Sequence, residues 1–191
     1  MKILIAYNSK TGNTKKLATG IYQTLRTQLP QHQIICTPIN RLKSINGFDV
    51  ILVGYWVDKG GPNKEATKFM KTIKNTKVGI FATLGEQPDS KHGMKALLRG
   101  EALVKQNNNV IGKFACQGAV SPKVLTFFKM LNHIDKNPKL KGKFNDEFIK
   151  NHALTPEKAK MYKLGAMHPN ELDIKYASAL FKERMLERII L

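Results

Sequence analysis

Apolar and polar positions follow two alternating patterns along the first two thirds of the chain. Short aliphatic runs without polar alternation, such as residues 2–7, predict strands that are buried on both faces. Between these runs apolar residues recur at helical spacing, as Leu17, Ile21 and Leu25 do. The pattern predicts strands at residues 2–7, 33–37, 49–54, 77–83 and 110–116, and helices at 15–29, 63–74, 91–107 and 122–130.

Five strands that alternate with helices and have short connections are typical of an α/β fold with a doubly wound, five-stranded parallel sheet. We expect this sheet domain to span residues 1–132. Residues 133–155 are polar and rich in turn-forming residues, and further helices are predicted from Thr155 and over 170–188. An apolar stripe on the last of these helices is formed by Leu172, Tyr176, Leu180 and Phe181. Because residues 133–191 are too few to bury a core alone, we expect a helical C-terminal extension that packs on the sheet domain or on a second subunit.

The connection after the first strand carries the donors of an anion-binding loop. Its residues are Ser9, Lys10, Thr11, Gly12, Asn13 and Thr14. Backbone N–H groups at a helix N-terminus bind phosphate, and three side-chain hydroxyls add to them here. Gly12 allows the backbone to approach an anion closely. The spacing matches neither the Walker loop nor the three-glycine dinucleotide fingerprint. The alternative interpretation is an ordinary turn that leads into a capped helix.

Residues 3–18 resemble the FMN phosphate loop that opens flavodoxins, because the Ser/Thr-x-Thr-Gly-x-Thr core of that loop is matched at each position. Weaker matches follow in residues 56–60, in residues 83–85 and in residues 116–118. Over about residues 1–130 the chain is thus similar to the bacterial flavodoxin-like family that includes the flavodoxin-like partner of bilirubin reductase. The resemblance implies strand order 2-1-3-4-5, with FMN at the switch point between the first and third strands.

The resemblance also implies two loops around the isoalloxazine ring of FMN. After the third strand, the residues expected to cover the ring are Tyr55, Trp56, Val57, Asp58, Lys59 and Gly60. Trp56 would stack on the ring; the alternative is an ordinary core or surface tryptophan. After the fourth strand, the pyrimidine edge is expected to meet backbone N–H groups of Thr83, Leu84 and Gly85. This loop lacks the tyrosine of many family members, so the second face of the ring is either covered by Leu84 or His92 or left open.

The chain is strongly basic, with 32 Lys and Arg against 14 Asp and Glu and a formal charge of +18. Residues 1–132 contain 20 of the basic and 6 of the acidic residues, so the excess lies in the expected sheet domain. Such a charge indicates an anionic partner. Nucleic acid is unlikely on chemical grounds, because the basic residues are scattered and no aromatic platform or nucleic-acid motif accompanies them. Lysines near the ring also predict a hydroquinone potential less negative than that of acidic flavodoxins.

Other sequence features predict a cytoplasmic protein. No apolar run is long enough to span a bilayer, and the N-terminus enters a strand without the layout of a signal peptide. Cys36 and Cys116 are the only cysteines and fall on opposite edge strands of the expected sheet, so we expect two buried, reduced thiols. No metal-binding spacing and no catalytic set of histidine with an acid or nucleophile stands out. The oligomeric state is left open.

Together these features predict an FMN-binding, flavodoxin-like electron-transfer protein that passes electrons to a redox partner enzyme with an acidic docking face. Two alternatives remain at this point. One is an FMN-dependent NAD(P)H:quinone reductase, in which an open second face of the ring admits both substrates. The other keeps the fold without a flavin and uses its basic surface to bind an anionic partner.

Overall fold

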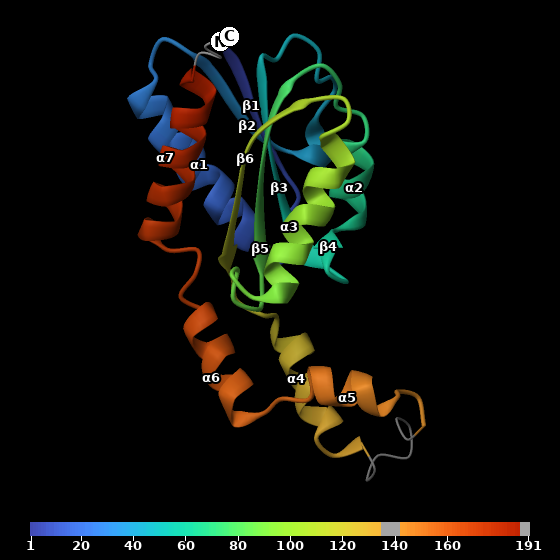
Figure 1. The fold of residues 1–191 in the computed structure, drawn as a ribbon. Coiled ribbons are helices and arrows are strands. Elements are labelled where there is room, and N and C mark those ends of the chain that lie inside the picture. The colour runs from blue at the N-terminus through green and yellow to red at the C-terminus, as the bar shows by residue number, and fades with distance from the viewer. Residues whose placement is uncertain (135–141, 188–191) are drawn as a thin grey trace.

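The computed structural model describes residues 1–134 and 142–187, and Figure 1 shows its ribbon. Five parallel strands form the sheet: β1 (Lys2–Tyr7), β2 (Gln33–Pro38), β3 (Val50–Asp58), β5 (Lys77–Leu84) and β6 (Asn109–Gln117). A short strand, β4 (Gly61–Pro62), pairs antiparallel with the end of β3. The helices are α1 (Asn13–Gln28), α2 (Lys64–Met70), α3 (Lys91–Val104), α4 (Pro122–Leu131), α5 (Asp146–His152), α6 (Pro156–Gly165) and α7 (Glu171–Leu186), with a 3-10 turn, η1 (Ile39–Arg41), after β2.

The order of the parallel strands across the sheet is β2-β1-β3-β5-β6. When these five strands are numbered along the chain, this is the order 2-1-3-4-5, so the predicted fold class is confirmed. The central strand β1 pairs with β2 on one side and with β3 on the other, and its residues Ile3 to Ala6 are completely buried. Such two-sided burial explains why Ile3 to Ala6 are all aliphatic. The change of direction at β1 leaves a crevice beyond the carboxyl ends of β1 and β3.

Helices cover both faces of the sheet (Figure 1). On one face α1 and α7 pack over a core that includes Ile5, Leu17 and Phe181. On the other face α2 and α3 pack over a core that includes Ile51 and Met70. Alternate residues of each strand point to opposite faces, so one buried strand supplies side chains to both cores. The sheet is therefore a rigid platform that fixes the positions of the loops at its carboxyl edge.

The last helix, α7, packs directly on α1 and β6 and completes one layer of the sheet domain. Its buried apolar side chains recur every fourth residue and are Ala177, Phe181 and Met185, with the buried Ser178 beside them. The predicted stripe is correct at Phe181 but wrong at Leu172 and Tyr176, which are 57% and 62% exposed. A capping box formed by Asn170 and Asp173 starts the helix. Because the helix begins at this capping box, Leu172 and Tyr176 lie on the face that points to solvent. The apolar pattern alone could not reveal this orientation.

Between β6 and α7 the chain forms a separate group of three helices, α4, α5 and α6, beyond the carboxyl ends of the strands (Figure 1). Helix α5 falls in the segment predicted to be turn-rich, so that prediction is wrong over residues 146–152; residues 135–141 of the same segment lie outside the described residues. The α5 helix is favoured by an Asn145 N-cap whose side chain accepts from the Phe148 N–H and by Asp146 and Glu147 in the first turn.

Two predictions about the cysteines and the membrane can be compared with the structure. Cys36 lies on edge strand β2 and Cys116 on edge strand β6, and both thiols are free, as predicted. Cys116 is buried, also as predicted, whereas Cys36 is only half-buried because it lies on an edge strand. Burial raises the pKa of Cys36 to about 11 and also raises that of Cys116. Within residues 1–134 and 142–187, none of the helices combines the length and the apolar character that crossing a bilayer would require.

Candidate functional site

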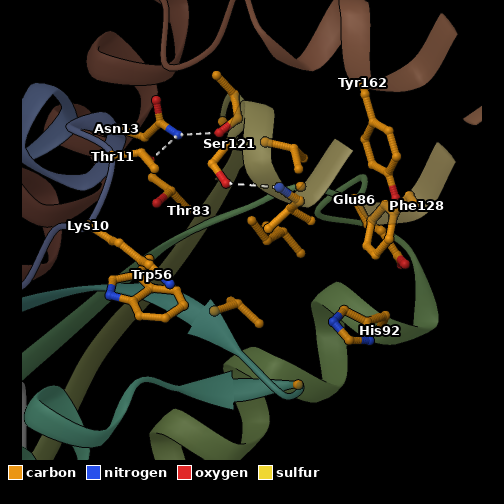
Figure 2. Close-up of a pocket in the computed structure, with 18 of the residues that line it drawn as sticks. Lys10, Thr11, Asn13, Trp56, Thr83, Glu86, His92, Ser121, Phe128 and Tyr162 are labelled. Atoms are coloured by element: carbon orange, nitrogen blue, oxygen red, sulfur yellow. Dashed lines mark hydrogen bonds between the residues drawn. The ribbon is translucent and has the colours of Figure 1, made fainter. Parts of the chain in front are cut away.

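A cavity of about 350 Å³ lies at the carboxyl edge of the sheet, between the loops of the sheet domain and helices α4 to α6 (Figure 2). Ligand pockets commonly have volumes of about 300–1,000 Å³. Ten of the residues predicted to bind the cofactor line this cavity: Lys10, Thr11, Asn13, Trp56, Val57, Lys59, Gly60, Thr83, Leu84 and Gly85. The fold therefore brings together the three loops that the sequence singled out.

The loop from Ser9 to Thr14 leads from β1 into helix α1 through Gly12. Gly12 is the N-cap of α1 and has φ of +96°, a conformation that strains any residue with a Cβ. The Gly12 N–H donates to the Ser9 hydroxyl over 3.2 Å, and the first turn of α1 contains no acidic residue. The Asn13 side chain bridges the Thr11 hydroxyl and the Ala119 carbonyl at 3.3 and 3.0 Å. The amino end of α1 is thus positive and faces the cavity side of the loop.

Thr14 does not line the cavity. Its side chain is buried, 1% exposed, and its hydroxyl lies 2.9 Å from the hydroxyl of Thr83, which is 3% exposed. The two hydroxyls tie the loop after β1 to the end of β5. Ser9 and Gly12 are also absent from the cavity lining, so within this loop Lys10, Thr11 and Asn13 are the residues that contact the open space.

Trp56 forms one wall of the cavity and is held in place at its polar edge (Figure 2). Its indole N–H donates to Oδ1 of Asn8 over 3.1 Å, and the same oxygen accepts from Nδ2 of Asn63 over 2.9 Å. The Lys10 ammonium lies 4.9 Å from the centre of the indole ring. An exposed cation–π contact contributes only about 0.5–1 kcal/mol, so a flat ligand could replace the lysine over this ring at small cost. The interpretation of Trp56 as a core residue is not supported.

The segment after Trp56 is a β-hairpin rather than the loop predicted to begin at Tyr55. Strand β3 continues to Asp58, which pairs with Gly61 of β4. Lys59 and Gly60 form the turn with φ of +50° and +77°, as a two-residue type I′ hairpin requires. The Arg99 guanidinium donates to the carbonyls of Lys59 and Gly60 over 3.1 and 2.9 Å. This contact fixes the hairpin tip against α3.

Two of the residues predicted for this ring loop lie elsewhere. Tyr55 is fully buried under α3, where its hydroxyl donates to the Ala96 carbonyl over 3.3 Å, and burial raises its pKa. Its assignment to the cofactor site is corrected, because strand alternation turns Tyr55 into the core and the adjacent Trp56 to the cavity. Asp58 takes part in the hairpin ladder and does not line the cavity.

The end of β5 and the residue after it contribute Thr83, Leu84 and Gly85 to the cavity lining, and Glu86 and His92 also line the cavity. The Gly118 N–H donates to the Leu84 carbonyl over 2.9 Å, which joins the end of β5 to the loop after β6. The positions of Leu84 and His92 at the cavity agree with their predicted place beside the site.

Sequence reasoning missed the wall that the chain after β6 contributes. The residues of this wall are Gly118, Ala119, Val120, Ser121, Val124, Phe128, Asn151, His152 and Tyr162. They come from the β6–α4 loop and from helices α4, α5 and α6. The adjacent residues Phe127 and Phe128, which follow a proline that starts a helix, indicate a second apolar cluster. The sequence does not indicate that this cluster faces the Ser9–Thr14 loop.

The cavity has the parts that a phosphorylated, flat ligand needs. One end has the positive helix terminus and the Thr11 hydroxyl, and the middle lies between Trp56 and the apolar residues of the opposite wall. Within residues 1–134 and 142–187 no group of three or more His, Cys, Asp and Glu could hold a metal ion. The donor set thus fits FMN, which combines a phosphate with an aromatic ring system.

Comparison with known proteins agrees with this reading of the fold. The flavodoxin domain family matches residues 4–182. The chain is similar to the flavodoxin-like domain-containing protein BilS of Clostridioides difficile (strain CD3), with 28% identity over 194 residues that cover 100% of this chain and 99% of that protein. A solved flavodoxin from the domain Archaea has a TM-score of 0.51 at 19% identity and covers 74% of this chain and 99% of its own.

A second solved structure, oxidised flavodoxin 2 from Bacillus cereus, has a TM-score of 0.50 at 15% identity and covers 93% of this chain and 99% of its own. At these identities the two structures show the likeness of the fold. The family match extends through β1 to β6 and most of α7, so the chain belongs to the flavodoxin domain family.

Proposed function

We propose that this protein binds FMN in the cavity at the carboxyl edge of the sheet and serves as an electron carrier. The observation that carries the proposal is the convergence of the Ser9–Thr14 loop and Trp56 on one cavity at the switch point of the sheet. A phosphate-binding loop alone would suit many ligands. The same loop beside an anchored indole suits a phosphorylated ring system.

Each part of the chain has a distinct role in this proposal. The amino end of α1 and the Thr11 hydroxyl hold the phosphate, and Trp56 stacks on the ring. The Arg99 contact keeps the hairpin beside Trp56 in a single position. FMN supplies the acceptance and release of electrons. The protein orients the ring, limits its contact with water and sets the charge around it.

The acceptor in this proposal is a redox partner protein with an acidic docking face. Support comes from the exposed lysines Lys10 and Lys59 at the cavity and Lys91 and Lys95 on nearby α3. Surface charge of one sign steers an oppositely charged partner and sets its orientation. Such docking weakens as salt rises.

The test is a titration of the purified protein with FMN, followed by flavin fluorescence, together with the visible spectrum of the complex. We expect saturable binding of one FMN per chain and quenched fluorescence, and Trp56→Leu should weaken binding by about tenfold or less, as for loss of one aromatic stack. Leu98→Ala is a matched control, because Leu98 is an exposed apolar residue outside the cavity. A protein that takes up no FMN would overturn the proposal and favour the flavin-free binding module.

A kinetic measurement separates the carrier from the NAD(P)H:quinone reductase. For a carrier, the FMN-loaded protein oxidises NAD(P)H only when a separate reductase is added. Steady NAD(P)H oxidation by the loaded protein and a quinone alone would replace the carrier with the reductase and leave the FMN site in place.

A further inference from the structure

The wall of the cavity opposite Trp56 is built from aromatic side chains of the three inserted helices. Phe128 comes from α4, His152 from α5 and Tyr162 from α6. The Phe128 ring centre lies 5.7 Å from that of His152 and 6.1 Å from that of Tyr162. Figure 2 shows Phe128 and Tyr162 together on the far side of the cavity from Trp56. The three helices therefore present a joint aromatic surface to the cavity.

This aromatic surface is supported from behind. Phe148 stacks on His152 with ring centres 4.1 Å apart, and Phe144 stacks on Phe148 at 4.8 Å. The Leu154 N–H donates to the Phe128 carbonyl over 3.2 Å, which ties α4 to the connection between α5 and α6. Side chains that are packed on their outer side lose little further entropy when a ligand contacts their inner side.

Tyr162 stands against the loop after β5. A Cβ at position 85 would lie 3.8 Å from Cε1 of Tyr162, so the backbone of that loop and the phenol ring are neighbours. Burial and the nearby Glu86 carboxylate raise the pKa of Tyr162, which keeps the phenol neutral. The loop itself has no tyrosine. A ring that the local sequence lacks is thus supplied by a helix far along the chain.

We propose that helices α4 to α6 complete the cofactor site, with Phe128 and Tyr162 covering the face of the flavin ring that is turned away from Trp56. This inference rests on the proposed binding of FMN. Both side chains are half-buried and line the cavity, and an aromatic surface on each side of a flat ring gives two stacking contacts in place of one. The inserted helices then act as a cover that keeps water from the ring.

The test uses Phe128→Leu and Tyr162→Leu in the full chain, with Phe127→Leu as a matched control. Phe127 belongs to the same aromatic cluster, with its ring centre 6.2 Å from that of Phe128, but it does not line the cavity. Two quantities are measured: the Kd for FMN, and the quenching by iodide of the residual fluorescence that the bound flavin retains.

We expect each cavity variant to raise the Kd by roughly three- to tenfold, as for loss of one aromatic stack, and to make the bound flavin more accessible to iodide. Phe127→Leu also removes a phenyl ring from the aromatic cluster, but it should leave the Kd for FMN within about twofold of wild type. Tyr162→Phe keeps the ring and should raise the Kd less than Tyr162→Leu does. Far-ultraviolet circular dichroism checks that each variant is folded.

Two results would overturn the inference. One is wild-type FMN affinity and iodide quenching in both cavity variants. The other is an equal loss of affinity in Phe127→Leu, since that would reflect the folding of the three helices and not a contact with the ring. These results leave the proposed function intact, whereas failure of the wild-type protein to bind FMN would remove both.

Discussion

The hydrogen bond between the hydroxyls of Thr14 and Thr83 links the phosphate loop to the sheet and lends itself to a quantitative test. Thr14→Val preserves the shape of the side chain and has nearly the same helix propensity, so the change removes little besides the hydroxyl. The Thr83 hydroxyl would then be left buried without this partner. Leaving such a group unpaired costs about 1–3 kcal/mol, which is the destabilisation we expect. For a chain of this size, each 1 kcal/mol lowers the Tm by roughly 2–4 °C.

The measurement is urea unfolding of wild type, Thr14→Val, Thr83→Val and the double variant. Because the double variant leaves neither hydroxyl unpaired, it should be less destabilised than the sum of the two single variants by about 1 kcal/mol or more. Equal m-values across the four proteins would show that the same surface is exposed on unfolding. Additive single effects, or a change below about 0.5 kcal/mol in Thr14→Val, would refute the hydrogen bond.

The same variants bear on the phosphate contact. If Thr14 remains bonded to Thr83 when FMN is bound, Thr14→Val should hardly change the Kd for FMN, and Thr11→Val should raise it because Thr11 lines the cavity. A large rise in Kd for Thr14→Val with little loss of stability would contradict this assignment and show that the Thr14 hydroxyl turns to the phosphate.

Three further predictions concern the hairpin, the thiols and the flavin potential. Arg99→Leu removes both hydrogen bonds to the hairpin turn, so amide hydrogen exchange at Lys59 and Gly60 should quicken; unchanged exchange would show that the pairing of β3 with β4 suffices. Because burial raises the pKa of Cys36 to about 11, its thiol is neutral at pH 8, and its alkylation should be slow in the folded protein and fast in urea. In the folded protein, alkylation of Cys116 should be slower than that of Cys36. Rapid alkylation of the folded protein would argue against this burial. Lys59→Gln should lower the hydroquinone potential of bound FMN, since a cation near the ring favours its anionic form, whereas an unaltered potential in redox titration would exclude that influence.

The strands β1, β3 and β5 could be predicted because burial on both faces leaves a run of apolar residues in each of them. The end of β3 could not, since Tyr55, Trp56 and Val57 are apolar without being aliphatic throughout, and the pairing with β4 depends on a tight turn at Lys59 and Gly60. Helix α5 was missed because it has few apolar residues, and its ring contacts reach Phe128 of α4 and Phe144, which no helical spacing of apolar residues reveals.

The candidate site was predictable where it depends on local sequence and unpredictable where it depends on distant contacts. The Ser9–Thr14 loop comes just after β1 and Trp56 lies near the carboxyl end of the neighbouring strand β3, so strand order alone brings them together. The assignment of Tyr55 was wrong because one residue of strand register decides between core and cavity. Tyr162 is far along the chain from the loop after β5, and its position beside that loop depends on how helices α4 to α6 pack together. No local sequence pattern encodes this packing.

The packing of α7 on α1 has a consequence for protein synthesis. Leu17 and Ile21 of α1 share a core with Phe181, which is translated only after the whole sheet and helices α4 to α6. Until α7 leaves the ribosome, one side of the nascent sheet exposes these aliphatic side chains to water and to chaperones. A chain interrupted before Glu171 would expose an apolar surface that α7 normally covers, so we expect prematurely terminated products to aggregate or to be degraded.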